Sequence, residues 1–598
     1  MTCWPWLPNE ILRELGQREG RLATILEVFR EVFPDEAKLR SLGSLRRLPT
    51  DTFAFVAHLL ERSGAYHHIS PEVTSSAPSK YRGIIVDDVR RANATAIGQA
   101  WRTGTVGIGE RLPSPPNEVE GLWKKLDGFR QVSVFEPMDD TAAAPEWWSI
   151  CLDILMITDE ACKDMGFQSA NPFFDFFMEE YTATDLSSGA QFRRVQRAPF
   201  SLSLAAEELL CVQAKARTPS SGCTLRSLSH NIALLPPRGQ VRARWVAPVI
   251  EADETRIQED LGLLLVPIPY EIEDHTFKPT GTSPDGHWGW FEVQQNWLPK
   301  VSTTGRKNGL VEFILGLIKV AREAGARVDA VVLPELALDF ANFRALARAL
   351  ASDRQIDFLI SGVSNNSEGR KGNFVAIAPF FLLGKERDEN ITAWENLILI
   401  REKHHRWKLD DTQIVSYGLD DLDTDMSWWE RLDILSRSLD LLVYRGRSTL
   451  TTLICEDLAR VDPCQAVVRA VGPNLLIALL MDGPQIAARW PGRYATVLAE
   501  DPGTSVLSLT SLGLMARQNK RGKFGQSSSI ALWKDEKSGL ISLELHRNAE
   551  ALVLELSPKF KKERTLDGRS DDGQSLRWEY KRHVQISSGR RAEASLVI

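Results

Sequence analysis

From residue 258 onward, short apolar runs alternate with amphipathic segments along the chain. The run LGLLLVPIP at 261–269 fits a buried strand, and residues 308–325 place apolar side chains at helical spacing before a glycine. VDAVVL at 328–333 fits a second buried strand, and further strand candidates continue to residue 533. Strands and helices that alternate in this way predict an α/β architecture.

The chain has 598 residues, which is too long for one ordinary core, so we expect two or three domains. Residues 1–250 carry helix-like segments between breaks rich in Pro, Ser and Gly, and we predict a mostly helical N-terminal region there. The α/β domain is expected over residues 258–548. Residues 549–598 are rich in charge, which favours a C-terminal tail or docking arm.

The composition is that of a soluble globular protein, with 43% hydrophobic and 25% charged residues. A net charge of −7 gives no reason to expect binding to nucleic acid or to an anionic membrane. The seven cysteines are odd in number and include no CxxC pair, which argues against a disulfide framework or a zinc ribbon. We therefore expect a reducing, cytoplasmic environment, and no apolar run approaches the roughly 20 residues of a membrane span.

Glu335 follows the apolar run in VVLPELAL, residues 331–338. A carboxylate at the point where a strand leaves the core is only partly solvated, which raises its pKa and makes it a usable general base. Taken alone, the residue also fits the start of a helix, where the helix dipole favours a glutamate.

Lys403 follows a second apolar run in LILIREKHHRWKLDD, residues 397–411, and can stabilise an oxyanion as a fixed cation. Lys408 is close enough in sequence to compete for this role, and a solvent-facing basic turn is the simpler interpretation of the cluster. The adjacent histidines, His404 and His405, do not predict a metal site, because neighbouring residues on a strand point to opposite faces.

Cys455 ends a third apolar run in TLTTLICEDLAR, residues 449–460. A cysteine at a strand-to-helix turn exposes its sulfur and receives the field of backbone N–H groups, which favours the thiolate. The commonest role of a free cysteine is structural and buried. Against that role, the flanking Glu456 and Asp457 are not expected to follow a cysteine into a core.

Together these segments resemble the nitrilase superfamily of carbon–nitrogen hydrolases, in which Glu, Lys and Cys each end a core strand. The family's motifs are an apolar run before P-E, a strand ending in a K-x-H-like stretch, and a strand ending in I-C-x-D or I-C-x-E. Here they read VVLPEL, ILIREKHH and TLICED. Lys403 follows Glu335 by 68 residues and Cys455 follows Lys403 by 52, and the second interval is longer than the family's usual one. We expect the helix-like segment 427–442 to be the insertion that lengthens it.

The resemblance implies an α-β-β-α sandwich, a catalytic triad of Glu335, Lys403 and Cys455, and an oxyanion contact from the backbone N–H of Glu456. Many members carry a second glutamate after the lysine, and Gln413 is the candidate for that supporting position. No metal or organic cofactor is implied. The Trp-containing stretch 273–300 is expected to be an insertion loop.

The function implied is hydrolysis of a non-peptide carbon–nitrogen bond in a small amide, carbamoyl compound or nitrile through a cysteine thioester, with amide favoured. A homodimer or higher oligomer is expected, and residues 1–250 are a candidate surface for a protein partner. Two alternatives stay open. The first alternative is a glutaminase-like supplier of ammonia to a partner, and the second is a nitrilase-like sensor or assembly module. Residues 211–237 faintly resemble the linker ahead of such modules in bacterial antiviral reverse transcriptases.

Overall fold

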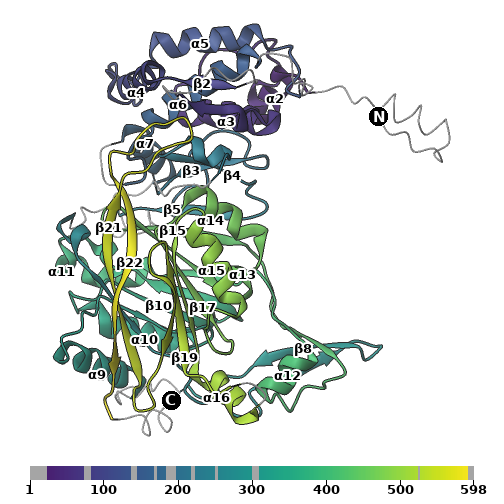
Figure 1. Ribbon diagram of the computed structural model, residues 1–598, viewed down its shortest axis with the longest axis vertical. Helices are drawn as coiled ribbons and strands as arrows, with labels where there is room; N and C mark the ends of the chain where they lie inside the picture. The colour runs from purple at the N-terminus through teal and green to yellow at the C-terminus, as the bar shows by residue number, and fades with distance from the viewer. Residues whose placement is uncertain are drawn as a thin grey trace, which may run out of the picture.

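The computed structural model describes residues 23–72, 83–135, 144–167, 171–182, 197–216, 222–248, 254–298, 309–522 and 525–589. Residues 1–22 of the predicted N-terminal region and 590–598 of the predicted tail lie outside this part of the chain. The mixed α/β class predicted from the alternating pattern is confirmed (Figure 1).

The first of two seven-stranded sheets is built mainly from the segment between residues 261 and 402. Its strand order is β12 (Leu399–Glu402), β11 (Lys371–Ala378), β10 (Phe358–Asn365), β9 (Ala330–Val332), β6 (Leu261–Leu265), β21 (Ala551–Lys561) and β22 (Ser575–Ile586). The central strands β6, β9 and β10 are parallel, so β9 and β10 both deliver the chain to the same edge of the sheet.

The second seven-stranded sheet follows later in the sequence. Its order is β20 (Gly539–Glu544), β19 (Ser529–Asp535), β18 (Ser505–Thr510), β17 (Leu475–Leu480), β16 (Ser448–Ile454), β15 (Ser438–Tyr444) and β5 (Arg242–Val246). Strand β5 comes from the predicted N-terminal region and pairs in parallel with β15. The predicted boundary near residue 250 therefore does not separate the two parts cleanly.

The two sheets share one core, and strand β17 shows how. Its sequence LLIALL is buried on both faces, as expected of a central parallel strand. Leu475, Ile477 and Leu479 belong to a cluster that also holds side chains of the first sheet. The alternate residues of β17 pack instead into a second cluster with the helices above them. This two-residue periodicity is what a strand between two apolar layers requires.

Helices cover the outer faces of both sheets (Figure 1). On the first sheet, α10 (Phe340–Ala351) packs against β10 and β11, beside α9 (Gly309–Glu323). Asp339 caps α10 by accepting a hydrogen bond from the backbone N–H of Asn342 at 2.7 Å. On the second sheet, α15 (Trp490–Glu500) packs against β18 and β19, and the short α13 (Glu456–Ala459) lies against β16.

The N-terminal region forms a separate layer of helices above the sheets (Figure 1). Its helices are α2 (Ile25–Val32), α3 (Pro49–Ser63), α4 (Asp88–Thr103), α5 (Asn117–Gly128), α6 (Glu146–Ala161) and α7 (Pro172–Thr182). Helix α6 is buried along its length and packs against α3, α4 and α5. None of the helices described in this chain combines the length and apolar character that crossing a bilayer needs.

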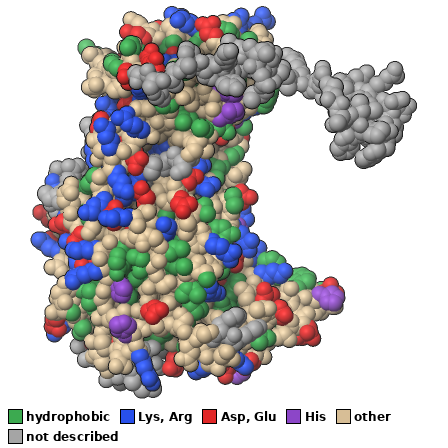
Figure 2. Space-filling view, viewed as in Figure 1, with side chains coloured by type: hydrophobic (Ala, Val, Ile, Leu, Met, Phe, Trp, Pro, Cys, Tyr) green, Lys and Arg blue, Asp and Glu red, His purple; other side chains and the backbone are tan. Residues whose placement is uncertain are grey.

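An arm stands out from the body of the protein (Figures 1 and 2). It is a four-stranded sheet in the order β13 (Lys408–Leu409), β14 (Ser427–Glu430), β8 (Trp288–Val293) and β7 (Phe277–Thr282), with α12 (Asp411–Tyr417) beside it. Two predictions are corrected here. Residues 273–300 include two strands rather than only a loop, and the helix predicted over 427–442 is replaced by β14 and the start of β15. Pairing of β14 with the distant β8 outweighs the local helical pattern.

The predicted charged tail is also corrected, because β21 and β22 are long antiparallel strands of the first sheet. Strand β21 pairs with β6, and its buried half reads ALVLEL. The turn between the two strands reaches the N-terminal layer, where the buried Arg569 contacts Asp159 and Glu160 of α6 at 3.0 Å each. Among the described residues, the charge that suggested a tail lies mostly at this turn and at the adjoining strand ends.

Candidate active site

Glu335 lies just beyond β9, in a turn that packs tightly against β10. Gly362 of β10 donates its backbone N–H to the carbonyl of Pro334 at 3.0 Å. A Cβ atom at Gly362 would lie 2.5 Å from the Cα of Glu335 and 2.4 Å from the backbone nitrogen of Leu336, so only glycine allows this approach. Leu336 itself has a φ of +54°, which turns the chain sharply after the glutamate. The turn buries Glu335 almost completely.

Lys403 follows β12 and extends its pairing with β11, since its backbone N–H donates to the carbonyl of Asn373 at 2.9 Å. Its side chain is fully buried. The Nζ atom donates to Oε1 of Glu335 at 2.8 Å and to Oε2 of Glu430 at 2.7 Å. The structure thus brings Glu335 and Lys403 into direct contact, whereas Lys408 lies over Trp429 instead.

Glu430 is a second glutamate that the sequence analysis missed. It ends β14, where its carboxylate accepts from Lys403 and from the backbone N–H of Trp407 at 3.1 Å. Asn373 bridges the two glutamates, donating from Nδ2 to Glu335 at 2.7 Å and to Glu430 at 2.8 Å. Glu430 was hidden because residues 427–442 were read as a helix. Recognising SWWE as a strand that ends in a carboxylate was the signal that could have found it.

Gln413 does not take the supporting position predicted for it. Its side chain and that of Asp410 form a capping box at the start of α12, with Gln413 accepting from the backbone N–H of Asp410 at 3.2 Å. Lys408 is exposed and lies over the ring of Trp429 at 5.3 Å from its centroid. Both residues therefore belong to the arm, and the acidic partner of Lys403 comes from β14.

Cys455 occupies the tight turn between β16 and α13. Its φ of +43° is rare for a residue other than glycine, and such backbone strain is of order 1–3 kcal/mol. The turn is held by two hydrogen bonds, from the backbone N–H of Cys455 to the carbonyl of Leu479 and from that of Leu458 to the carbonyl of Cys455, both 2.9 Å. Cys455 as a whole is 3% exposed, so the residue lies beneath the surface rather than in open solvent.

Asp457 ties the cysteine turn to the lysine segment. It is buried, contrary to the expectation that acidic residues after Cys455 stay at the surface. Its Oδ1 atom accepts from the backbone N–H groups of His404 at 3.0 Å and His405 at 3.1 Å. The residue two positions after Cys455 therefore holds the two residues that follow Lys403. Glu456, in contrast, is half-buried and pairs with Arg460 at 2.8 Å.

The pKa values of Glu335, Lys403 and Cys455 all differ from those of the same side chains in water. Burial raises the pKa of Glu335, an effect that the charge of Lys403 opposes. Burial disfavours the charge of Lys403, but Glu335 and Glu430 outweigh this and hold its pKa well above the usual value. Burial and then Glu335 raise the pKa of Cys455 well above that of an ordinary thiol. The resting thiol is therefore protonated and needs a base, and Glu335 and Lys403 are near enough to influence it.

The two histidines serve structural roles. Burial lowers the pKa of His404 to about 4, so its ring is neutral near pH 7. One ring nitrogen lies 2.9 Å from Sγ of Cys464 and the other lies 2.9 Å from the carbonyl of Ser438. Among the residues whose placement is described, no group of His, Cys, Asp and Glu is arranged to hold a metal ion.

A cavity of about 560 Å³ opens beside Glu430, between the arm and the first sheet. Its lining is mostly polar or charged and includes Gln295, Asp339, Lys371 and Arg431. Gln295 also donates to the carbonyls of Leu336 and Leu338, on the turn that carries Glu335. The cavity therefore reaches the acidic partner of Lys403 and the loop of the candidate base.

No protein-family model matches this chain, and no curated protein matches it. Several solved structures are similar to about half of it. An amidase from Nesterenkonia sp. is 13% identical over 50% of this chain and 90% of its own, with a TM-score of 0.28. A glutamine-dependent NAD+ synthetase from Acinetobacter baumannii is 11% identical over 54% of this chain and 48% of its own, with a TM-score of 0.28. Nit3 of Saccharomyces cerevisiae, a member of the nitrilase superfamily, is 13% identical over 50% and 90%, with a TM-score of 0.26. Similarity at this level carries no functional argument, which rests on the site itself.

Proposed function

We propose that this protein is a thiol-dependent carbon–nitrogen hydrolase, with Cys455 as nucleophile, Glu335 as general base and Lys403 as the cation that stabilises the oxyanion. The observation that carries this proposal is the buried lysine held between two glutamates beside a cysteine in a strained turn. We also propose that the two sheets and their outer helices are the α-β-β-α sandwich of the nitrilase superfamily.

In the first half of the reaction, Glu335 accepts the thiol proton of Cys455 and the thiolate attacks the carbonyl carbon of the substrate. Lys403, together with the backbone N–H of Glu456, stabilises the oxyanion of the tetrahedral intermediate. Glu335 returns the proton to the leaving nitrogen as the carbon–nitrogen bond breaks. The amine or ammonia departs and a thioester on Cys455 remains.

In the second half, water replaces the amine as the reacting group. Glu335 accepts a proton from the water as its oxygen attacks the thioester carbonyl, and Lys403 again stabilises the oxyanion. The carbon–sulfur bond breaks, the thiol regains its proton, and the acid is released. Glu430 and Asn373 are positioning residues, because they hold Lys403 and Glu335 without touching the reacting atoms.

The raised pKa values support this division of labour. A buried carboxyl group with a raised pKa is a stronger base toward a thiol than an exposed glutamate, so Glu335 suits proton transfer. The cavity beside Glu430 has a mostly polar lining, which suits a small substrate with hydrogen-bonding groups, such as an amide. We therefore keep amide hydrolysis as the leading activity within the proposal.

The test is a panel of small amides, carbamoyl compounds and nitriles, with release of ammonia as the signal. We expect Cys455→Ala to lose turnover while remaining folded, and Cys464→Ala, which removes another buried cysteine, to keep it. Full activity in Cys455→Ala would contradict the proposal.

A second measurement does not require the substrate. Iodoacetamide labelling followed by peptide mass spectrometry reports the reactivity of each cysteine, and Glu335→Gln should slow labelling of Cys455 while leaving the exposed Cys223 unchanged. Base-dependent labelling of Cys455 with no turnover on the panel would favour the sensor or assembly alternative. Labelling of Cys455 that does not depend on Glu335 would remove the base from the mechanism.

A further inference from the structure

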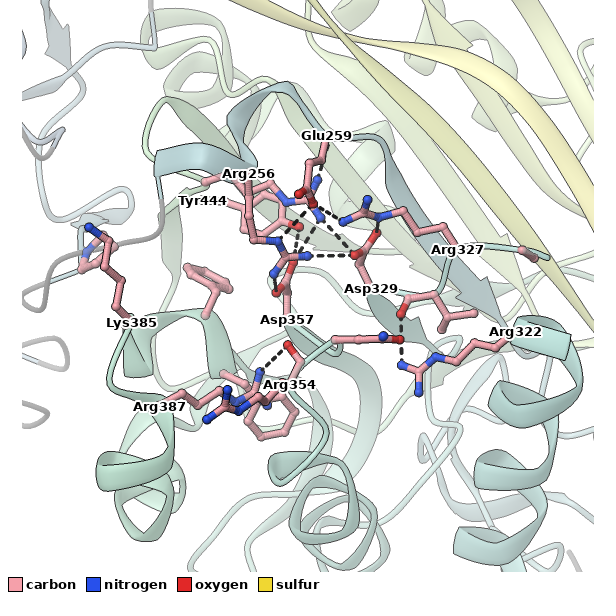
Figure 3. Close-up of a pocket in the computed structure, with 18 residues that line it drawn as sticks. Arg256, Glu259, Arg322, Arg327, Asp329, Arg354, Asp357, Lys385, Arg387 and Tyr444 are labelled. Atoms are coloured by element: carbon pink, nitrogen blue, oxygen red, sulfur yellow. Dashed lines mark hydrogen bonds and ion pairs between the residues drawn. The ribbon is translucent and has the colours of Figure 1, made fainter.

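A second cavity, of about 550 Å³, lies at the other end of the strands that carry the candidate active site (Figure 3). Asp329 and Asp357 line it and stand immediately before β9 and β10. Glu335, in contrast, follows β9. Because β9 and β10 run in parallel, their first residues share one edge of the sheet and their last residues share the opposite edge.

The second sheet gives the same separation. Arg445 lines the cavity just before β16, and Cys455 follows that strand directly. A strand of this length spans roughly 20 Å at about 3.3 Å per residue. The cavity near Arg445 is therefore a separate site from the one at Cys455.

Arginine dominates the charged lining of this cavity. Six arginines contribute to it: Arg256, Arg322, Arg327, Arg354, Arg387 and Arg445. Figure 3 labels all of them except Arg445 and shows Arg256 and Arg327 near Asp329, with Arg354 near Arg387. On the face drawn in Figure 2, Lys and Arg side chains also gather along one flank below the N-terminal layer.

One group of these arginines is already neutralised by carboxylates. Arg256 pairs with Asp329 at 2.9 Å and with Asp357 at 2.5 Å, and Arg327 pairs with Asp329 at 2.7 Å. Arg445 lies 3.2 Å from both aspartates. This network joins the two sheets and forms a rigid wall of the cavity.

Arg387 differs from that group. Its side chain is about 9% exposed, and it donates to the carbonyls of Ile356 at 2.7 Å and Ala351 at 2.8 Å. Within the described part of the chain it forms no ion pair with a carboxylate, and its Nε atom makes no hydrogen bond. Burial lowers the pKa of Arg387 below the usual value, and the charges of Asp357 and Asp353 oppose this effect without reversing it.

Two further features surround Arg387. Arg354 stands beside it at the rim of the cavity (Figure 3), exposed and paired with the surface residue Asp388. The guanidinium of Arg387 lies 5.3 Å from the ring centroid of Phe380, and the neighbouring Phe381 is partly exposed in the cavity lining. A pair of guanidinium groups next to an aromatic ring can bind an anion and a planar organic group together.

We propose that this cavity binds a small phosphate monoester, with the phosphate between Arg387 and Arg354 and its organic part against Phe381. Phosphate matches arginine better than a carboxylate does, because its oxygens accept from two planar guanidinium forks at once. The volume lies in the usual range for small-molecule sites and exceeds what inorganic phosphate alone would fill. A nucleoside monophosphate supplies both the dianion and a flat ring.

The test is isothermal titration calorimetry of the full chain with AMP, inorganic phosphate and adenosine. We expect AMP to bind, inorganic phosphate to bind more weakly because it lacks the ring, and adenosine not to bind because it lacks the charge. Arg387→Gln and Arg354→Gln should each weaken AMP binding at least tenfold. Arg354→Gln changes an exposed side chain, so it tests the site even if Arg387→Gln fails to fold.

The matched control is Arg348→Gln, on α10, because Arg348 is also an exposed arginine paired with a surface carboxylate, here Glu395. It should leave AMP binding unchanged. Absence of AMP and phosphate binding at millimolar concentration would overturn the proposal, as would binding that survives Arg354→Gln at wild-type strength. Because the readout is binding, the result is independent of whether Cys455 supports turnover.

Discussion

Replacing Lys403 with methionine tests the electrostatic structure of the candidate site directly. The Nζ atom of Lys403 bonds to Glu335 at 2.8 Å and to Glu430 at 2.7 Å, and all three side chains are buried. Methionine keeps the length and apolar stem but leaves two buried carboxylates without their cation. Breaking a buried ion pair in this way costs about 3–5 kcal/mol of stability.

The loss should depend on pH with a predictable sign. The raised pKa of Lys403 means that the wild-type protein keeps its stabilising charge at all pH values below the unfolded lysine's pKa of about 10.4. In Lys403→Met the two carboxylates must be buried unpaired or take up a proton. As pH falls toward the ordinary glutamate pKa of about 4.3, Glu335, whose pKa burial raises, takes up a proton in the folded state, and the cost of its unpaired charge falls. The deficit should therefore be largest at neutral and higher pH and should shrink toward pH 5.

The assay is thermal unfolding at pH 8 and pH 5, with Lys408→Met as the matched control. At pH 8 we expect the Tm of Lys403→Met to fall by about 6 °C or more, since 1 kcal/mol shifts Tm by roughly 2 °C in a large domain. Lys408 is exposed over Trp429, a contact worth only about 0.5–1 kcal/mol, so its loss should shift Tm by about 2 °C or less. Equal shifts for the two variants, or a larger deficit at pH 5 than at pH 8, would refute the reasoning.

Three further predictions address the supporting residues. Glu430→Gln should lower kcat/KM for ammonia release about 10- to 100-fold, because it removes a charge-assisted hydrogen bond worth about 1.5–3 kcal/mol. The control variant Gln413→Ala, in the cap of α12, should keep kcat/KM within about twofold of the wild-type value. Similar values for the two variants would return the supporting role to Gln413. Gly362→Ala should destabilise the protein by about 1–3 kcal/mol in chemical denaturation, because the added Cβ would lie 2.4–2.6 Å from backbone atoms of residues 334–336. The control variant Gly316→Ala in α9 adds its Cβ to open space, so it should leave stability unchanged or raise it. Arg569→Met should speed proteolysis within the N-terminal layer, because it leaves buried carboxylates of α6 unpaired, and unchanged cleavage would show that this contact does not hold the layer.

The sequence was sufficient to single out the three residues on which the proposed mechanism rests. Each of them follows an apolar run. In the structure Lys403 and Cys455 directly follow β12 and β16, and Glu335 lies in the turn just beyond β9. The contact between Glu335 and Lys403 was predictable because polar residues that follow buried strands of one sheet gather at its edge. The mixed α/β class followed from the same alternation. These features are local, so each of them can be recognised from a single segment of the sequence.

The missed elements depend on partners far away in the sequence. Segment 427–442 has apolar residues at helical spacing, yet Trp428 and Trp429 belong to a strand because β8, about 140 residues earlier, offers them an edge. That error concealed Glu430 and left Gln413 as the nearest candidate. The role of Asn373 likewise depends on distant partners, since its amide bridges two glutamates that lie on other segments of the chain.

The position of β21 has a consequence for how the protein is made. Strand β6 lies between β9 and β21, and β21 begins 290 residues after β6 begins. At about 5–20 residues per second, translation leaves one edge of β6 without its partner for roughly 15–60 s. That edge carries the sequence LGLLL, and an exposed apolar strand edge readily pairs with other chains. Nascent chains that stop before residue 551 should therefore be prone to aggregate, and chaperone binding during synthesis should concentrate on this interval.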